Sequence, residues 1–591
     1  MADQGQSTEK TPSWRERAEA SRPRGAFLDP AREPVEGLSA FPTAYEPSRL
    51  LVSADRADAV SSLEAAATEF GWGVSSETLT GRRLDAPAEG GASLEGDEPA
   101  LTRVRIFPAP RPDRDDEPVP PVDSWRLLQR AREMTLRARR GDGGGTSLER
   151  RAPVPPPEDQ TVPFTLPDDS PLRNVGLDHL ISVDSMGVNP FIPTNPFIPT
   201  NPFIPTNPFI PTNPSGTAGY AMPGTGGRQV VSYVGPPPRR RADAEFTGRR
   251  PVVAFLDTGC GQHEWLEGGV VIRRAPLGGS TPGHTVLGIE DETTDPETHP
   301  DQAGPFDGYL DVGAGHGTFI AGIILQACPD AQLLSVRVTD SQGTVFESEL
   351  ITALEELVVL IDKHAVGQEG GQVVDVVNLS LGYYHETPED GLFNTRLGDV
   401  LTDLRSRGCA VVCSAGNDAT DRPAFPAALW NWGDEFTVPD PGGAAPHVAV
   451  GALNPTKTSV ALYSNIGPWV HVYAPGTSVL SISPDFKGGT QAGSRDDRFG
   501  RRRESLDPDD YQSGFALWSG TSFAAPHVAG RIAEELAKEL IVPLAVGAKP
   551  PKVRKSRGGR TAQALAAHVA TVGQATERAL QSVRKEDRSP L

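Results

Sequence analysis

The chain has little of what several protein classes require. Its four cysteines, Cys260, Cys328, Cys409 and Cys413, are too few for a disulfide scaffold in 591 residues, and none forms a CxxC pair. We therefore expect buried, reduced thiols. No apolar run reaches the ~18 residues that span a bilayer, and the first 30 residues hold no run of secretory-signal length. These absences predict a cytoplasmic protein.

Positive charge is also scarce. The 56 Lys and Arg residues face 77 Asp and Glu residues, for a net charge of −21 at pH 7. Such a chain is repelled by phosphate backbones and anionic lipids. We therefore expect neither a nucleic-acid partner nor a membrane partner.

Glycine and proline are abundant, with 62 and 57 residues, while hydrophobic residues make up 37%. This composition predicts one large packed unit diluted by loop-rich and disordered sequence. The length is about four times the usual domain size, so several domains are expected.

The first part of the chain predicts a leader and a small domain. Residues 1–47 mix Arg, Glu, Pro and Ser without apolar periodicity, which predicts a disordered leader. Residues 48–183 then show strand and helix patterns in the order β-α-β-β-α-β, the order of a small ferredoxin-like α+β domain. The predicted elements are strands at 49–54, 72–79, 101–107 and 176–183 and helices at 55–70 and 122–137.

Residues 184–249 predict a Pro-rich linker. Within it, residues 189–212 are four copies of Asn-Pro-Phe-Ile-Pro-Thr. Two prolines in every six residues remove backbone donors and favour an extended tether. We favour a spacer over a repeated ligand that presents its phenylalanines to an apolar groove, because the sequence by itself supplies no groove.

Residues 250–540 predict a large α/β domain with a mostly parallel, buried sheet. Apolar runs at 251–257, 332–338, 375–381, 410–416 and 447–452 alternate with helical patterns such as the one at 347–364. Residues 541–591 add a basic linker and an Ala-rich helix at 561–584, which we expect to be a solvated tail, although the helix could dock on a partner.

Four short segments lie where α/β folds place their active groups, at strand ends and helix starts. They are Asp257-Thr258-Gly259, Gly315-His316-Gly317-Thr318, Ser414-Ala415-Gly416-Asn417 and Ser519-Gly520-Thr521-Ser522. Taken singly, such an acid often only caps the next element, and such a histidine is more often structural. Their combination is far more informative.

In this order, DTG, GHGT, SAGN and GTSFAAPHVAG resemble the signature motifs of the subtilisin-like serine peptidases, the subtilases, over about residues 250–540. The resemblance implies a three-layer subtilisin-like fold and a serine endopeptidase. It implies a triad of Asp257, His316 and Ser522, with Asn417 as the oxyanion-hole side chain. Sedolisin-like peptidases share an SGTS turn but use acids in place of the histidine, and GHGT after a DTG strand argues against them.

The resemblance also implies how a substrate binds. Subtilases bind the substrate as an added extended strand, here beside the segment that follows the central strand. The substrate-binding residues expected on this basis are Ser380, Leu381, Gly382, Ser414, Ala415 and Gly416. Tyr383 replaces a glycine that lines the primary specificity pocket in the best-known members, so it could narrow that pocket.

No metal or cofactor is expected. His263, Glu264, His284 and His299 lie near Asp257 in the sequence but lack a ligand spacing such as HExxH. The charged insertion 485–513 runs up to the strand before Ser522, where a mobile loop could gate the cleft.

Subtilase propeptides are small ferredoxin-like domains that assist folding and lie across the cleft with their C-terminal tail in the substrate site. The resemblance therefore implies that 48–183 is an inhibitory or chaperone domain, with processing at 184–189 or 215–229. A permanent regulatory domain is the rival hypothesis for residues 48–183.

The alternative function from another class is a catalytically silent scaffold that recruits partners through the Pro-Phe repeats and the C-terminal helix. Arginine far outnumbers lysine, and alanine, glycine and proline are abundant, which favours a GC-rich bacterial origin.

Overall fold

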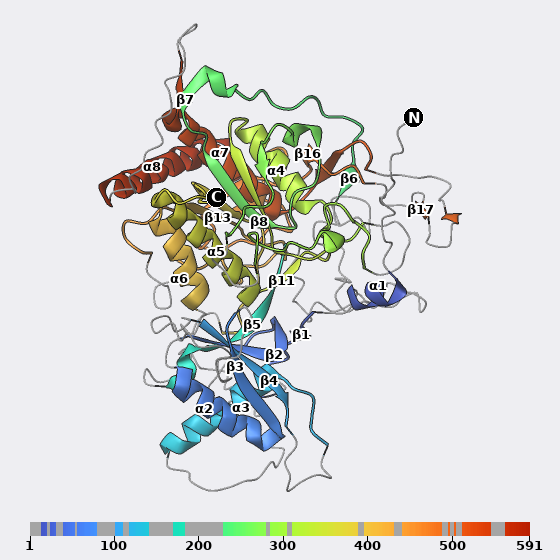
Figure 1. The fold of residues 1–591 in the computed structure, drawn as a ribbon, viewed down its shortest axis with the longest axis vertical. Helices are drawn as coiled ribbons and strands as arrows, with labels where there is room; N and C mark the ends of the chain where they lie inside the picture. The colour runs from blue at the N-terminus through green and yellow to red at the C-terminus, as the bar shows by residue number, and fades with distance from the viewer. Residues whose placement is uncertain are drawn as a thin grey trace.

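The structure is a computed structural model of the 591-residue chain (Figure 1). The residues that it describes are 13–20, 24–30, 33, 40–53, 56–79, 101–109, 118–140, 170–183, 228–278, 284–303, 310–387, 395–430, 440–486, 495–496, 501–503, 511–544 and 562–590. The repeats at 189–212 lie outside this set.

The N-terminal domain, residues 26–183, has the predicted order of elements. They are β2 (Ala44–Ser53), α2 (Arg56–Phe70), β3 (Trp72–Glu77), β4 (Leu101–Pro108), α3 (Ser124–Arg140) and β5 (Val175–Ser182), with the short β1 (Ala26–Phe27) paired to β2. The strands form an antiparallel sheet in the order β5-β2-β4-β3. Both helices lie together on one face of the sheet (Figure 1), where Leu63, Leu127 and Leu128 are fully buried.

The large domain, residues 228–544 with the C-terminal helix, is built on a seven-stranded sheet. Its strands are β8 (Val252–Asp257), β9 (Val271–Ile272), β10 (Gln332–Arg337), β12 (Val376–Leu379), β13 (Ala410–Ser414), β14 (His447–Leu453) and β15 (Val472–Pro475). They follow the order β15-β14-β13-β12-β8-β10-β9, and every neighbouring pair is parallel. The predicted parallel, buried sheet is confirmed.

Helices cover both faces of this sheet and make three layers. α4 (His316–Ala327) and α7 (Thr521–Leu540) pack on one face, and α5 (Glu347–Ala365) and α6 (Thr395–Ser406) pack on the other. Alternate side chains of β8 show the two faces, since Phe255 packs with the first pair of helices and Leu256 with the second. This arrangement follows from the period of two along a strand.

Smaller strands complete the large domain, and they correct the expected extent of the linker. β6 (Gln229–Val230) pairs with β19 (Phe515–Trp518), which also pairs with β16 (Val479–Ile482), and β7 (Phe246–Gly248) pairs with β20 (Ile541–Pro543). The remaining short strands are β17 (Arg495–Asp496) and β18 (Arg502–Arg503). Residues from 228 onward, predicted as linker, therefore belong to the large domain. Short polar segments of this kind carry too little pattern to be detected as edge strands.

The expected disordered leader is also corrected. Residues Trp14–Ala20 form helix α1, and the buried Arg17 donates to Asp301 Oδ1 at 2.5 Å and to the Ala303 carbonyl at 2.9 Å. The segment is ordered by a charged contact with a residue far away in the sequence. Apolar periodicity cannot report such a contact.

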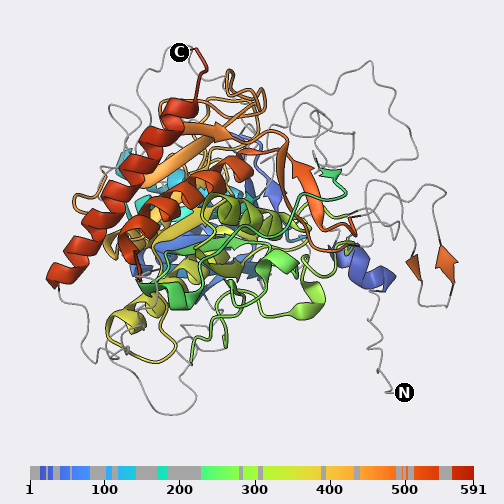
Figure 2. The ribbon, with the colours of Figure 1, turned by 90° about the horizontal axis from the view of Figure 1, so that it is seen from above.

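The C-terminal helix is docked and not a solvated tail. α8 (Ala562–Glu586) lies along α7 at the outer side of the molecule (Figure 2), and it buries Val572, Ala575, Ala579 and Val583 in the core of the large domain. The helix packs against its own chain, whereas docking on a separate partner was the alternative to a solvated tail. No helix among the described residues is long and apolar enough to cross a membrane.

The two domains share one sheet. β11 (Thr344–Phe346) of the large domain pairs antiparallel with β5, and thereby extends the sheet of the N-terminal domain to β11-β5-β2-β4-β3. Figure 1 shows β5 reaching from the small domain up to β11. The residue after β5, Val183, reaches Ser522 of the fourth motif.

Candidate active site

Asp257 and His316 meet where β8 ends and α4 begins. Nδ1 of His316 lies 2.8 Å from Oδ1 of Asp257, and both side chains are buried. The backbone N–H of Thr258 also donates to Asp257 Oδ1, at 2.8 Å. Because a carboxylate can only accept, the proton of the imidazole lies on Nδ1, and Nε2 is left as the acceptor.

Glycines in the two motifs make this approach possible. A Cβ atom on Gly317 would lie 2.1 Å from the carbonyl oxygen of Gly259, so the first turn of α4 rests directly on the turn after β8. Gly315 has φ +79°, a left-handed conformation that favours glycine. The DTG and GHGT motifs are therefore two halves of one close contact.

Ser522 is the second residue of α7, and a proline shapes its surroundings. Pro526 lies inside the helix and has no N–H to donate to the carbonyl four residues earlier, which is that of Ser522. Oγ of Ser380 donates to this carbonyl instead, at 2.8 Å, while Nδ2 of Asn378 donates to Ser380 Oγ at 2.9 Å. Side chains from β12 and from the residue after it thus fix the first turn of α7.

Asn417, just after β13, is oriented by the residue before Ser522. Its Oδ1 accepts from the backbone N–H of Thr521 at 2.8 Å and from Thr521 Oγ1 at 2.9 Å. Since both contacts use the amide oxygen, the NH₂ group of Asn417 is left as a hydrogen-bond donor beside the start of α7.

Two aromatic rings pack against His316, and one of them belongs to α7. The ring of His316 lies 5.4 Å from that of Trp518 and 5.1 Å from that of Phe523, the residue after Ser522. Among the described residues, the hydroxyl of Ser522 donates to the carbonyl of Val183 at 2.8 Å and, more weakly, to that of Ser380 at 3.4 Å. The serine therefore faces a residue of the N-terminal domain.

The end of the N-terminal domain occupies the groove as an extended strand. Ser182 and Gly382 exchange backbone hydrogen bonds of 3.0 and 2.9 Å, and the N–H of Val183 donates to the carbonyl of Gly343 at 3.0 Å. With the pairing of β5 to β11, the strand is bonded on both sides. The resemblance to subtilases implies a substrate strand beside the same segment, and that implication stays a prediction.

The six expected substrate-binding residues divide into two groups. Gly382 bonds the strand and Ser380 bonds Ser522, while Leu381 between them is buried in the core of the large domain. Among the described residues, Ser414, Ala415 and Gly416 make no hydrogen bond to the strand at 175–183. Their role in binding stays a prediction.

The ring of Tyr383 lies against the docked strand, which the sequence did not anticipate. It stacks on the ring of His179, with centroids 4.6 Å apart and planes 25° apart. Its hydroxyl donates to Oε1 of Glu347 at 2.9 Å. The structure thus places Tyr383 beside a residue four positions before Val183.

Sequence reasoning missed Glu297, a buried carboxyl group that contacts the two residues after His316. It accepts from Thr318 Oγ1 at 2.5 Å, from the N–H of Gly317 at 3.1 Å and from Oγ1 of Thr258. Burial raises its pKa to about 7, although the threonine hydroxyls oppose that shift. It stands in an acidic loop among similar residues, so no sequence signal distinguishes it.

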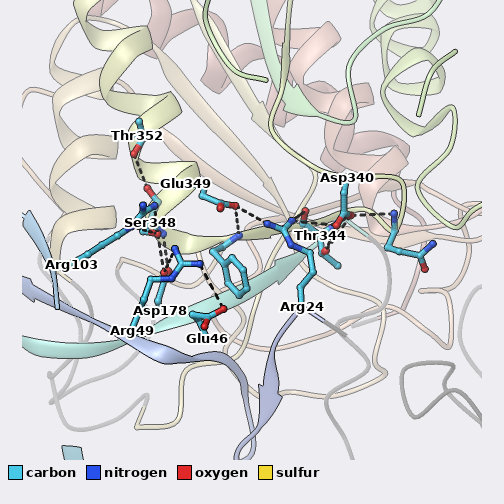
Figure 3. A network of polar contacts seen from close by, with 12 residues as sticks. Arg24, Glu46, Arg49, Arg103, Asp178, Asp340, Thr344, Ser348, Glu349 and Thr352 are labelled. Atoms are coloured by element: carbon cyan, nitrogen blue, oxygen red, sulfur yellow. Dashed lines mark hydrogen bonds and ion pairs between the residues drawn. The ribbon is translucent and has the colours of Figure 1, made fainter. Parts of the chain in front are cut away.

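Polar contacts at the start of α5 hold the N-terminal domain in place (Figure 3). Asp178 accepts from the N–H of Ser348 at 3.0 Å and from its hydroxyl at 2.9 Å, and Arg103 donates to the same hydroxyl. Arg24 pairs with Asp340 at 3.2 Å and with Glu349 at 3.1 Å. The docked strand is therefore flanked by ion pairs and by a helix cap.

One group in the described part of the chain has metal-ligand geometry. The ligand atoms of His179, His385 and Glu386 lie within 4.8 Å of one another, and all three residues are buried. Both ring nitrogens of His179 contact carboxylates, however, at 2.7 Å each. A ring that donates from both nitrogens has no lone pair for a metal. These three residues are therefore suited to hold a protonated imidazole and not a metal ion.

Comparisons with known proteins agree with the motifs. The model of the Subtilase family matches residues 248–543, half of the chain. Subtilisin NAT of Bacillus subtilis subsp. natto is 29% identical over 235 residues, which are 38% of this chain and 46% of that protein. Subtilisin-like protease 5 of Arthroderma gypseum is 31% identical over 231 residues, which are 38% of this chain and 44% of that protein.

The chain thus spans a little under half the length of these relatives. The crystal structure of a cold adapted subtilisin-like serine proteinase also matches, at 20% identity and a TM-score of 0.30, over 57% of this chain and 86% of that chain. The order of motifs, the parallel sheet and the family match lead to one conclusion: this chain belongs to the subtilase family.

Proposed function

We propose that the protein is a serine endopeptidase that is restrained by its own N-terminal domain. The observation that carries the proposal is the strand at 180–183, which is bonded on both sides within the groove and accepts a hydrogen bond from Oγ of Ser522 at 2.8 Å. A peptide bound as an added strand is what an endopeptidase of this family would cleave.

The geometry of the buried groups supports the following chemistry. Ser522 attacks the substrate carbonyl while Nε2 of His316 accepts its proton, and Asp257 holds the imidazole through Nδ1 and stabilises the imidazolium that forms. The NH₂ group of Asn417 and the backbone N–H of Ser522 donate to the developing oxyanion. His316 then returns the proton to the leaving amine, and water hydrolyses the acyl-enzyme by the same steps in reverse.

The restraint is competition for the groove. Backbone donors and acceptors of β11 and Gly382 that would bind a substrate are used by residues 180–183. A substrate in trans must therefore displace β5 together with the sheet of which it is part. Release requires loss of the N-terminal domain by cleavage or undocking.

The geometry favours processing directly after the docked strand. The carbonyl of Val183 is the described carbonyl that Ser522 contacts at 2.8 Å, which supports the processing range 184–189 over 215–229. Both ranges lie outside the described residues, except for 228–229. We expect self-cleavage within a few residues of Val183.

The intact mass of purified wild type, compared with Ser522→Ala after the same incubation, tests the proposal. We expect the wild-type chain to be cleaved near residue 184 and the Ser522→Ala chain to keep its full-length mass. Full-length protein in both samples would refute self-maturation and favour a retained regulatory domain. If peptide substrates also remained uncut by both, the catalytically silent scaffold would replace the peptidase.

A further inference from the structure

A cationic side chain of the N-terminal domain sits between two carboxylates of the large domain. Nδ1 of His179 is 2.7 Å from Oε2 of Glu347, and Nε2 of His179 is 2.7 Å from Oε2 of Glu386. His179 lies on β5, Glu347 begins α5, and Glu386 lies after β12. Three elements from two domains thus converge on one buried imidazole.

The environment requires a positive charge on His179. Each ring nitrogen has a carboxylate oxygen as its partner, and carboxylates accept hydrogen bonds but do not donate them. Burial by itself would lower the pKa of His179, but the charges and hydrogen bonds of Glu386 and Glu347 outweigh it and raise the pKa to about 10. The stacked ring of Tyr383 covers the imidazole and excludes water.

This contact lies in the groove that would bind substrate. Side chains along a strand alternate, and His179, Ile181 and Val183 are buried against the large domain while Leu180 and Ser182 are partly exposed. Ile181 and Val183 pack into the core of the large domain beside Val345. His179 therefore fills a position of the same groove, four residues before the carbonyl that Ser522 contacts.

The acidic pair belongs to the large domain, whereas its cationic partner leaves with the N-terminal domain. Glu386 also interacts with the positive charge of Arg132 on α3, which departs together with His179. Two basic groups of the large domain itself lie near Glu386. Nδ1 of His385 is 3.4 Å from Oε2 of Glu386, but burial lowers the pKa of His385 to about 3, so its ring is neutral. The guanidinium of Arg422 donates to the carbonyls of Pro42 and His385. Two buried carboxylates without a bonded cation are costly, so a substrate that brings one is favoured.

We propose that Glu347 and Glu386 form an acidic subsite that selects substrates with a cationic side chain four residues before the position of Val183. This inference rests on the proposed peptidase function and defines its substrate class. His179 is the built-in occupant of the subsite, and lysine or arginine of a protein substrate supplies the same charge. Tyr383 shapes the subsite by stacking on its occupant and by holding Glu347 through its hydroxyl.

Amide hydrogen exchange on the full chain tests the subsite without any need for hydrolysis. In a Ser522→Ala background, exchange at Ser182 and Val183 reports how firmly the strand is held, because both amides donate to the large domain. We expect His179→Gln to speed this exchange at least 10-fold and His179→Lys to change it less than 3-fold. Equal exchange in the two variants would overturn the acidic subsite.

Removing one carboxylate provides the matched comparison. Glu386→Gln in the same background is expected to speed exchange at Ser182 and Val183 by about 10-fold. Glu355→Gln is the control, since Glu355 lies on α5 but pairs with Arg396 outside the groove. Equal exchange rates in the two variants would mean that any loss of negative charge loosens the strand, and would contradict a specific role of Glu386.

Peptide hydrolysis tests the same subsite in trans. Quenched peptides with the sequence of residues 176–188, carrying lysine, glutamine or glutamate at the place of His179, are added to wild-type protein after the incubation in which it is expected to process itself. We expect kcat/KM for the lysine peptide to exceed that for the glutamine peptide at least 10-fold, and Glu347→Gln to remove most of this ratio. Equal rates for the three peptides would refute the preference.

The two experiments separate the two proposals. If wild type cleaves no peptide, or cleaves as slowly as Ser522→Ala, the peptidase function fails. The exchange measurements still decide whether the acidic pair selects a cation.

Discussion

Two buried carboxyl groups, Asp257 and Glu297, lie at the start of α4 and have different surroundings. Asp257 accepts from His316 and from the backbone of Thr258, whereas Glu297 is fully buried with threonine hydroxyls and the N–H of Gly317. Thr258 contacts both acids, at 3.1 Å in the case of Asp257. The histidine is thus supported by one acid directly and by a second through a threonine.

Glu297 gives a prediction about pH and stability. Its pKa is raised from 4.5 to about 7 by burial, so the folded state binds its proton more tightly than the unfolded state does. The resulting contribution to the free energy of unfolding is complete below pH 4.5 and is lost as pH rises through about 7. Its size is on the order of 3 kcal/mol.

Denaturant unfolding between pH 4.5 and 8 measures this effect. We expect Glu297→Gln to reduce the fall in unfolding free energy over that range, although Asp311, whose pKa burial also raises to about 7, keeps part of it. Glu292→Gln is the control, because this residue of the same loop is exposed. A pH dependence identical to wild type in Glu297→Gln would contradict the prediction.

Among the secondary-structure elements, helix α5 joins the two domains. Its first residue, Glu347, contacts His179 of β5. Its second residue, Ser348, donates to Asp178, the residue before His179 (Figure 3). The residue before the helix is Phe346, whose side chain cannot cap. An aspartate of another domain therefore satisfies an N–H of the first turn that the helix leaves open.

Removing this cap should loosen the docked strand. Asp178→Ala in the Ser522→Ala chain deprives the Ser348 N–H of its acceptor, which costs about 1 kcal/mol for a typical cap, or roughly 5-fold in exchange at Ser182 and Val183. Asp58→Ala, on the exposed side of α2, is the control. Unchanged exchange in Asp178→Ala would show that the strand is held without the cap.

On the scale of the whole molecule, segments from both ends of the chain complete the large domain. α1 contributes a buried arginine, β6 and β7 add edge strands, and α8 covers α7. The large domain therefore includes residues outside 248–543, the range that the family model matches. The parts outside that match are held by packing that each of them cannot achieve alone.

The docking of α8 can be tested with two adjacent positions. Ala575 is fully buried between α8 and α7, while its neighbour Gln574 faces solvent. Ala575→Asp places a charge in this apolar contact, at a cost of roughly 3 kcal/mol, so we expect a lower unfolding temperature or faster amide exchange over 562–586. Gln574→Asp should match wild type. Identical behaviour of the two variants would contradict the docking of the helix.

Local sequence patterns were enough to predict the main secondary-structure elements and to name the candidate triad. The strands at 251–257 and 410–416 and the helix at 347–364 follow from local periodicity, because a strand repeats every two residues and a helix every 3.6. The residues named for the triad stand in short motifs that also contain glycines and small side chains. These small residues are needed where two segments pack closely, as at Gly317. The Asp257–His316 contact follows from where β8 ends and α4 begins.

Contacts between residues far apart in the sequence could not be predicted in this way. His179 is 168 residues from Glu347 and 207 from Glu386, and no spacing or period relates them. Glu297, the order of α1 and the docking of α8 were missed for the same reason. Such contacts depend on how charge and shape match between segments that the fold brings together. A sequence pattern, in contrast, reports only the interactions between residues that are near one another in the chain.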